Sequence, residues 1–211
     1  MTAACALALA GPAPALAVCP NEDAIPTAEN LEEIRAAVIC LHNEARAEAN
    51  VALLSTDTRL TTAAEGHAHD MVAQGYFGHD SPSGQDPFDR MREAGYIGSR
   101  FVWNAGETIA WAPGLLATPR RVMDAWMKAT SQRLTLLAPD FRDIGVGIAL
   151  GAPVQHLPGS APAVTYTVDY GWRTTRRALR RCLRRAAQRR QALRRVMRAK
   201  CHGLARSGLS R

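Results

Sequence analysis

The side chains best suited to acid–base or ligand-binding chemistry in this chain are His79 and Glu107. His79 lies among aromatic and polar residues in a loop at residues 75–82. A neutral imidazole beside a carboxylate is suited to proton transfer near neutral pH. No nucleophile motif accompanies the two residues, since Ser81 belongs to no strand-to-helix elbow. Two interpretations stay open: the pair acts in chemistry, or its members hydrogen-bond each other and hold two loops together.

Two further histidines, His67 and His69, lie on the helix predicted before that loop. Residues two apart on a helix point about 200° apart, so both cannot face one metal ion. We therefore expect one histidine at the edge of the core and the other in solvent. His42 and Arg46, one turn apart on an earlier helix, are predicted to have structural roles.

Four helices are predicted from apolar residues at helical spacing and from capping residues at their starts. They cover residues 27–49, 57–74, 86–95 and 118–127. Gly75 is expected to end the second helix and so to release His79 into its loop. The last two helices begin at Asp86-Pro87 and Thr118-Pro119, where proline suits the first helical position.

Strands are predicted at residues 100–103, 143–150 and 163–170 from β-branched, aromatic and alternating residues. The last two are expected to form a hairpin with a long loop, and Gly106-Glu107 to lie in a turn. Helices that precede antiparallel strands favour an α+β fold in which helices sandwich a small sheet.

The first 17 residues carry no charged side chain and end in Ala15-Leu16-Ala17, a pattern typical of a secretory signal peptide. The positive n-region of such a signal is missing, which a start codon further upstream would explain. This stretch is also too short for a membrane-spanning helix. We therefore expect export, with residues 18–35 as a lead-in to the folded domain.

The five cysteines bear on the expectation of export. Cys19 and Cys40 flank the entry to the first helix, and an exported chain is expected to pair them. Such a bond would stabilise the fold by about 3 kcal/mol through loop closure. The alternative is that Cys19 is a lipid attachment site, which the bulky Val18 before it disfavours. Cys182 and Cys201 have no obvious partner besides each other.

Charge divides the chain into an acidic body and a basic tail. The whole sequence carries a net charge of +7, but residues 173–211 hold 14 Arg, one Lys and no acidic residue. Residues 1–172 therefore carry a net charge of −8. Apolar residues recur in the tail at helical spacing, which predicts a basic amphipathic helix for an anionic surface. The alternatives are a functionless extension or a frame-shifted translation.

Five motifs in order give the body a resemblance to the CAP superfamily (cysteine-rich secretory, antigen 5, pathogenesis-related 1), in its bacterial secreted branch. The resemblance covers about residues 36–172 and implies a CAP-type α-β-α sandwich, and bacterial relatives support the Cys19–Cys40 pair. The motifs are Leu41-His42-Asn43-Glu44-Ala45-Arg46, His67-Ala68-His69-Asp70-Met71, Tyr76-Phe77-Gly78-His79-Asp80-Ser81-Pro82, Gly106-Glu107-Thr108-Ile109, and Ile144-Gly145-Val146-Gly147 with Asp169-Tyr170-Gly171.

The family's cleft holds two histidines and acidic residues, which bind a divalent metal in some members. The resemblance assigns His79 as the first histidine and Glu107 as the glutamate, but Gln132 stands where the second histidine is expected. No position matches the second acidic residue. Because glutamine is a poor ligand for a transition metal, we expect no metal cofactor. Trp111 is predicted to face the ligand, whereas Trp103 and Trp126 are expected in the core or the cleft wall.

The function expected from the resemblance is a secreted, non-enzymatic domain that binds lipid or cell-envelope ligands around His79 and Glu107. A cell-wall or peptide hydrolase that uses the same two residues is the first alternative. An interaction protein that docks its basic tail on the envelope is the second. The expected export argues against nucleic acid as a partner, although arginine density would serve such binding. The oligomeric state and the ligand stay open.

Overall fold

The computed structural model describes residues 18–154 and 162–207. The predicted signal peptide at residues 1–17, with Cys5, lies outside the described residues. The side chains of residues 192–207, which include Cys201, also lie outside the description.

The described residues are built around one mixed sheet of four strands in the order β1-β3-β4-β2. The hairpin predicted from the two C-terminal strands is confirmed, since β3 and β4 pair antiparallel. β2 pairs antiparallel with the other side of β4, and the two-residue β1 adds a parallel edge beside β3. The strands are β1 Ser55–Thr56, β2 Phe101–Pro113, β3 Asp143–Leu150 and β4 Ala163–Thr175.

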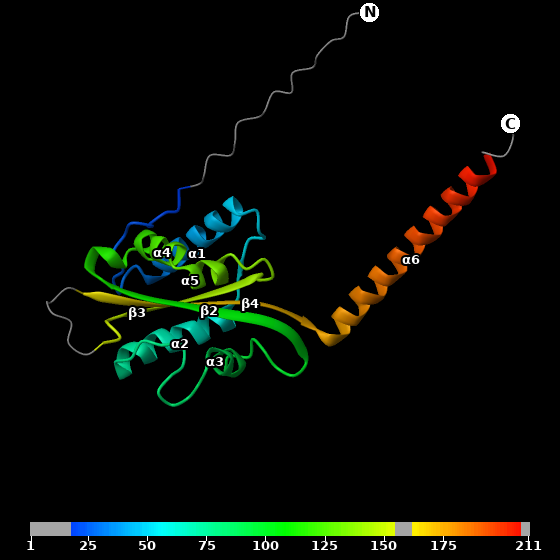
Figure 1. Ribbon diagram of the computed structural model, residues 1–211. Helices are drawn as coiled ribbons and strands as arrows, with labels where there is room; N and C mark the ends of the chain where they lie inside the picture. The colour runs from blue at the N-terminus through cyan, green and yellow to red at the C-terminus, as the bar shows by residue number, and fades with distance from the viewer. Residues whose placement is uncertain (1–17, 155–161, 208–211) are drawn as a thin grey trace, which may run out of the picture.

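Helices cover both faces of this sheet, as predicted for an α+β sandwich. Figure 1 shows α1, α4 and α5 on one face and α2 and α3 on the other. The α-helices are α1 Leu31–Glu48, α2 Thr58–Gln74, α3 Pro87–Glu93, α4 Pro119–Lys128, α5 Thr130–Leu136 and α6 Arg176–Ser207, with a short 3-10 helix η1 at Gly114–Ala117. None of the described helices combines the length and the apolar character needed to cross a bilayer.

The predicted starts of three helices are confirmed by their capping hydrogen bonds. The side chain of Asp57 caps α2, Asp86 forms a capping box with Asp89 in α3, and Thr118 caps α4. The predicted start of α1 at Thr27 is wrong, because the Thr27 backbone N–H donates to the Asn30 side chain and the helix begins only after that turn.

Alternation along the strands sends neighbouring residues to opposite faces of the sheet. On β3, Ile144, Val146 and Ile148 face the large core formed with α1 and α4. Gly145 and Gly147 face α2, and a Cβ atom at these positions would lie only 2.1 and 2.2 Å from that helix's backbone. Glycine is therefore what allows α2 to pack directly on the sheet.

β2 corrects the predicted turn at Gly106-Glu107. The strand is continuous over its whole length because every residue from Phe101 to Pro113 has a register partner on β4. Glu107 therefore lies in mid-strand, directly opposite Asp169, and its side chain points toward α2 and α3.

A buried polar network lies on the α1 face, and it confirms the structural roles predicted for His42 and Arg46. His42 Nδ1 donates to the Val38 carbonyl at 2.7 Å, and its Nε2 accepts from the Tyr170 hydroxyl at 2.8 Å. The Thr108 hydroxyl lies 3.0 Å from that of Tyr170. Arg46 is fully buried, and its guanidinium donates to backbone carbonyls of four residues: Ala52, Leu136, Ala138 and Phe141.

The predicted disulfide between Cys19 and Cys40 is confirmed, with Cα atoms 5.7 Å apart. It ties the buried start of the lead-in segment to α1. Because the sulfur of Cys19 is used in this bond, it is not free for the alternative role of lipid attachment.

β4 continues across the boundary predicted at residue 172. Arg173 belongs to the body, since its guanidinium lies over the rings of Tyr96 and Phe101 and donates to the Tyr96 carbonyl. The helix predicted in the tail is present as α6, which begins directly after the strand at Arg176.

Candidate functional site

His79 reaches the surface because α2 ends where the sequence predicts. Gly75 serves as the C-cap in a left-handed conformation with φ of 69°, which residues with a side chain rarely adopt without strain. The chain then turns into the loop that carries Phe77 and His79. The His79 side chain is 47% exposed, and its Nδ1 donates to Glu107 Oε1 at 2.7 Å.

Glu107 is held on its other side by Arg90, a residue that the sequence patterns did not single out. Arg90 projects from α3, and its guanidinium donates to Glu107 Oε2 at 2.8 Å. The same group donates to the carbonyls of His79 and Gln85 at 2.8 and 3.0 Å. Both carboxylate oxygens of the buried Glu107 are thus used within the protein, and Arg90 fixes the loop backbone on either side of Ser81.

His67 forms the buried floor of this site. Its Nε2 donates to the Gly78 carbonyl at 2.9 Å and lies 3.8 Å from Glu107 Oε1. Burial lowers the pKa of His67, which keeps the ring neutral at neutral pH. His69 is exposed on the opposite side of α2, so the prediction of one buried and one solvated histidine is confirmed.

Asp169 places a second carboxyl group beside Glu107. It is fully buried on β4 directly opposite Glu107, and neither carboxyl oxygen has a hydrogen-bond partner among the described residues. Burial, with the negative charge of Glu107, raises the pKa of Asp169 well above its usual range. The fold therefore favours the protonated form of Asp169.

The hydrogen bond from His79 to Glu107 acts on the exposed histidine as well. It stabilises the imidazolium form and raises the pKa of His79, against the effect of partial burial. His79 therefore carries positive charge to a higher pH than a free histidine. Its Nε2, which makes no hydrogen bond within the described residues, can donate to a ligand.

The residues of this site fit a divalent metal poorly. Each oxygen of Glu107 already accepts a hydrogen bond, one from His79 and one from the positively charged Arg90, so a metal ion would have to compete with both donors. Among the side chains that the structure describes, those of residues 18–154 and 162–191, no cluster of three His, Cys, Asp or Glu could hold a metal ion. The expectation of no metal cofactor stays a prediction.

The remaining predicted cleft residues do not join this hydrogen-bonded cluster. Gln132 lies on α5, in the helical layer that covers the other face of the sheet, and makes no hydrogen bond to His79 or Glu107 (Figure 1). Trp111 is half-buried near the end of β2, so its predicted contact with a ligand stays a prediction. Trp126 is a core residue, whose Nε1 donates to the Ile109 carbonyl at 3.0 Å. Trp103 packs on Phe88.

The sequence carried weak signals for two of the three residues that it did not assign to this site, His67 and Asp169. His67 shares the apolar face of α2 with Ala63, Ala64 and Met71, where a polar side chain needs a buried partner. Asp169 lies directly opposite Glu107 once the two strands are paired, so both side chains point to the same face of the sheet. Arg90 follows a capping box and gave no signal that it would be buried.

Comparisons with known proteins agree with this fold. The family model described as the cysteine-rich secretory protein family, CAP, matches residues 39–170. The chain is 36% identical over 110 residues to the uncharacterized protein YkwD of Bacillus subtilis, a match that covers 52% of this chain and 40% of YkwD.

Two solved structures are similar. One is an extracellular protein containing an SCP domain from Bacillus anthracis, with a TM-score of 0.50, 26% identity, and coverage of 69% of this chain and 44% of that one. The other is an outer surface protein from Borrelia burgdorferi, with a TM-score of 0.53, 21% identity, and coverage of 71% and 97%. The chain thus spans less than half the length of the two Bacillus proteins. With its family match and its α-β-α sandwich, the chain belongs to the CAP superfamily of cysteine-rich secretory proteins.

Proposed function

We propose that this CAP domain works outside the cytoplasm as a non-enzymatic binding module for amphipathic lipid or cell-envelope ligands. Its location is supported by the Cys19–Cys40 disulfide, because such bonds persist in oxidising compartments. The similar Bacillus anthracis protein, which is described as extracellular, agrees with that location.

The observation that carries the proposal is the pairing of a half-exposed His79 with a buried Glu107, both of whose oxygens accept hydrogen bonds within the protein. Glu107 holds the imidazole in place with Nδ1 inward, so Nε2 is left for a ligand. Phe77, two residues before His79 in the same loop and 44% exposed, supplies an apolar surface. A hydrogen-bond donor with a raised pKa and an exposed aromatic ring in one loop suit a ligand with an anionic or polar head and an apolar part.

The same contacts favour binding over hydrolysis. A serine nucleophile needs a base within hydrogen-bond reach. The Ser81 hydroxyl instead lies 2.8 Å from that of Ser83 and accepts from the Gln85 backbone N–H. A hydrolase that uses His79 and Glu107 would therefore have neither a free carboxylate nor an activated serine.

The test is an NMR titration of the full chain with a short-chain phosphatidylglycerol, kept below its micelle concentration. We expect the signals of His79 and Phe77 to shift, and the His79→Gln variant to bind at least tenfold more weakly, the equivalent of about 1.5 kcal/mol for one charged hydrogen bond. The matched control is His69→Gln, which changes an exposed histidine on the preceding helix and should leave binding unchanged. Shifts that spare residues 75–82, or equal loss in both variants, would contradict the proposal.

A further inference from the structure

The helix α6 is a second candidate interaction surface, separate from the site around His79. It begins at Arg176, directly after β4, and Figure 1 shows it extending away from the sandwich. Its side chains are described as far as Gln191, and those of residues 180–191 are all exposed. Residues 173–211 contain no acidic residue, so the arginines of α6 have no carboxylate partner within their own segment.

From Arg176 to Ala186, α6 has two chemically different sides. With about 100° between successive residues, six arginines occupy one half of the helix: Arg176, Arg177, Arg180, Arg181, Arg184 and Arg185. We call these residues the arginine side. The apolar strip lies opposite and consists of Ala178, Leu179, Cys182, Leu183 and Ala186.

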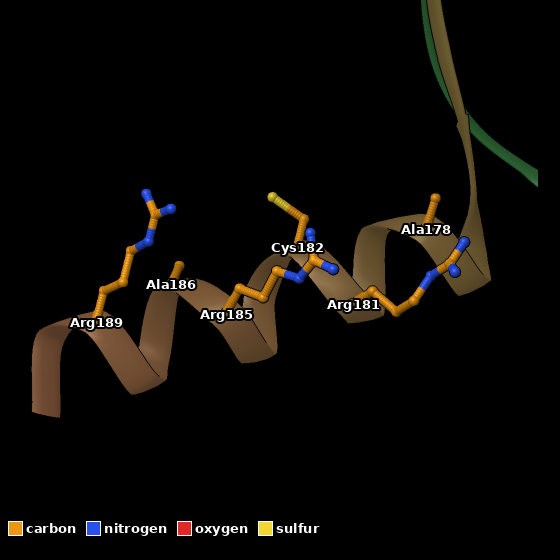
Figure 2. A pocket seen from close by; sticks show the side chains of 6 residues that line it. All are labelled: Ala178, Arg181, Cys182, Arg185, Ala186 and Arg189. Carbon is orange, nitrogen blue, oxygen red and sulfur yellow. The ribbon is translucent and has the colours of Figure 1, made fainter. Parts of the chain in front are cut away.

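Figure 2 shows where the two sides meet. Ala178, Cys182 and Ala186 follow one line along the helix, with Arg181 and Arg185 beside them. Arg189 and Arg190, in the next turn, lie on the side of the apolar strip, so arginine is absent from that side only as far as Ala186. A long arginine side chain can keep its stem on an apolar surface while its guanidinium reaches the polar boundary.

From this arrangement we infer that α6 binds an anionic lipid surface, with the apolar strip toward the acyl chains and the arginine side at the phosphate groups. Basic amphipathic helices bind in this orientation because burial of apolar area and attraction to anionic lipids act together. The inference does not depend on ligand binding at His79.

Charge and polarity favour lipid over two other occupants. A nucleic acid would use the arginines through its phosphates but would leave the apolar strip in water. A second copy of α6 packed along this strip would bring the flanking arginines of both helices close together, where like charges repel. An anionic bilayer accommodates both sides of the helix at once.

The first test is co-sedimentation of the full chain with vesicles of phosphatidylglycerol and phosphatidylcholine in equal amounts. Each basic residue near such a surface strengthens binding roughly fivefold, about 1 kcal/mol, so replacing Arg177, Arg181 and Arg184 by Gln should weaken binding on the order of 100-fold. The matched control replaces Arg121, Lys128 and Arg133, three exposed basic residues of the body, by Gln. It removes the same charge and should change binding by less than about threefold. Equal loss in both triple variants would overturn the inference.

The second test separates a lipid from a polyanion. Replacing Leu179 and Leu183 by Ser should weaken vesicle binding at least tenfold but leave binding to a short DNA duplex unchanged. Vesicle binding by this variant at the wild-type level would overturn the inference, because attraction of charge alone would then be sufficient.

The third test determines the orientation of the helix. A nitroxide on Cys182, with Cys5 and Cys201 replaced by Ser, should become accessible to oxygen and protected from a water-soluble nickel chelate when vesicles are added. The control label at position 184, placed with Arg184→Cys and Cys182→Ser, lies about 160° around the helix and should stay accessible to the chelate. Equal protection at the two positions would contradict the proposed orientation.

Discussion

Two polar networks lie back to back on the same two strands, and they differ in whether they reach solvent. The closed network consists of His42, Thr108 and Tyr170, is fully buried on the α1 face, and has a hydrogen-bond partner for each group. The open network consists of His79, Glu107, Arg90, Asp169 and His67, lies on the α2 face, and ends in a half-exposed imidazole.

The difference comes from strand alternation. Glu107 and Thr108 are neighbours on β2, as Asp169 and Tyr170 are on β4, so one pair of adjacent positions on each strand contributes to both networks. The closed network stabilises the fold, because all its groups are used within it. The open network leaves one donor, His79 Nε2, without a partner among the described residues, so that it can bind a ligand. Substitutions in the two networks should therefore have effects of different size and different pH dependence.

The largest difference is expected when each histidine is truncated. His42→Ala should lower the free energy of unfolding by about 4 kcal/mol, because it opens a cavity and leaves the buried Tyr170 hydroxyl without its acceptor. His79→Ala should cost less than about 1 kcal/mol, since its side chain is half-exposed. Urea unfolding of the two variants measures both values. Similar losses would mean that the two networks do not divide structure from binding.

Acid should destabilise the protein through the closed network. Burial lowers the pKa of His42 to about 4, against an ordinary value of 6.5. Its contribution to stability is therefore complete above pH 6.5, where the unfolded histidine is also neutral, and is lost as the pH falls through about 4. The loss amounts to about 3 kcal/mol. A folded-state NMR titration of His42 with a midpoint near its ordinary value would refute this prediction.

Within the open network, Arg90 should matter most to the fold. Arg90→Met leaves Glu107 buried with one charged partner removed, which should cost about 3 kcal/mol. The control Arg92→Met removes an exposed arginine that pairs with Asp89 on the same helix, and should cost less than about 1 kcal/mol. Chemical denaturation of both variants gives the comparison. If Arg90→Met were as mild as its control, Glu107 would not depend on Arg90.

Asp169 should show the opposite pH dependence from His42. Its pKa is raised in the folded protein, so folding takes up a proton between the unfolded and folded pKa values and stability falls as the pH rises. Asp169→Asn removes this effect. The free energy of unfolding of the variant, relative to that of the wild type, should therefore rise with pH by up to about 1.4 kcal/mol per pH unit. Unfolding curves over a pH range of about 5 to 8 measure the trend. A gain that does not change with pH would show that Asp169 is ionised in the fold.

Local signals in the sequence predicted the parts of this molecule that depend on neighbouring residues. Gly75, the Asp86-Pro87 and Thr118-Pro119 helix starts, the C-terminal hairpin and the Cys19–Cys40 pair are all of this kind. Each depends on capping, turn chemistry or alternation over a few residues, or on two cysteines close in the chain.

The parts that were missed depend on partners far away in the chain. Ala105-Gly106-Glu107 has little strand propensity, and it is a strand only because β4 pairs with it along its whole length. Arg90 is buried only because Glu107 lies against α3. Asp169 became the second carboxyl of the site only when the register of β2 and β4 was known.

The central claim is that Glu107 holds His79 in its charged, outward-facing form, and the pKa of His79 measured by NMR tests it most directly. In the wild type this pKa should lie above 6.5, because the hydrogen bond to Glu107 stabilises the imidazolium. In Glu107→Gln it should fall to 6.5 or lower. A His79 pKa that is unchanged by Glu107→Gln would contradict the account.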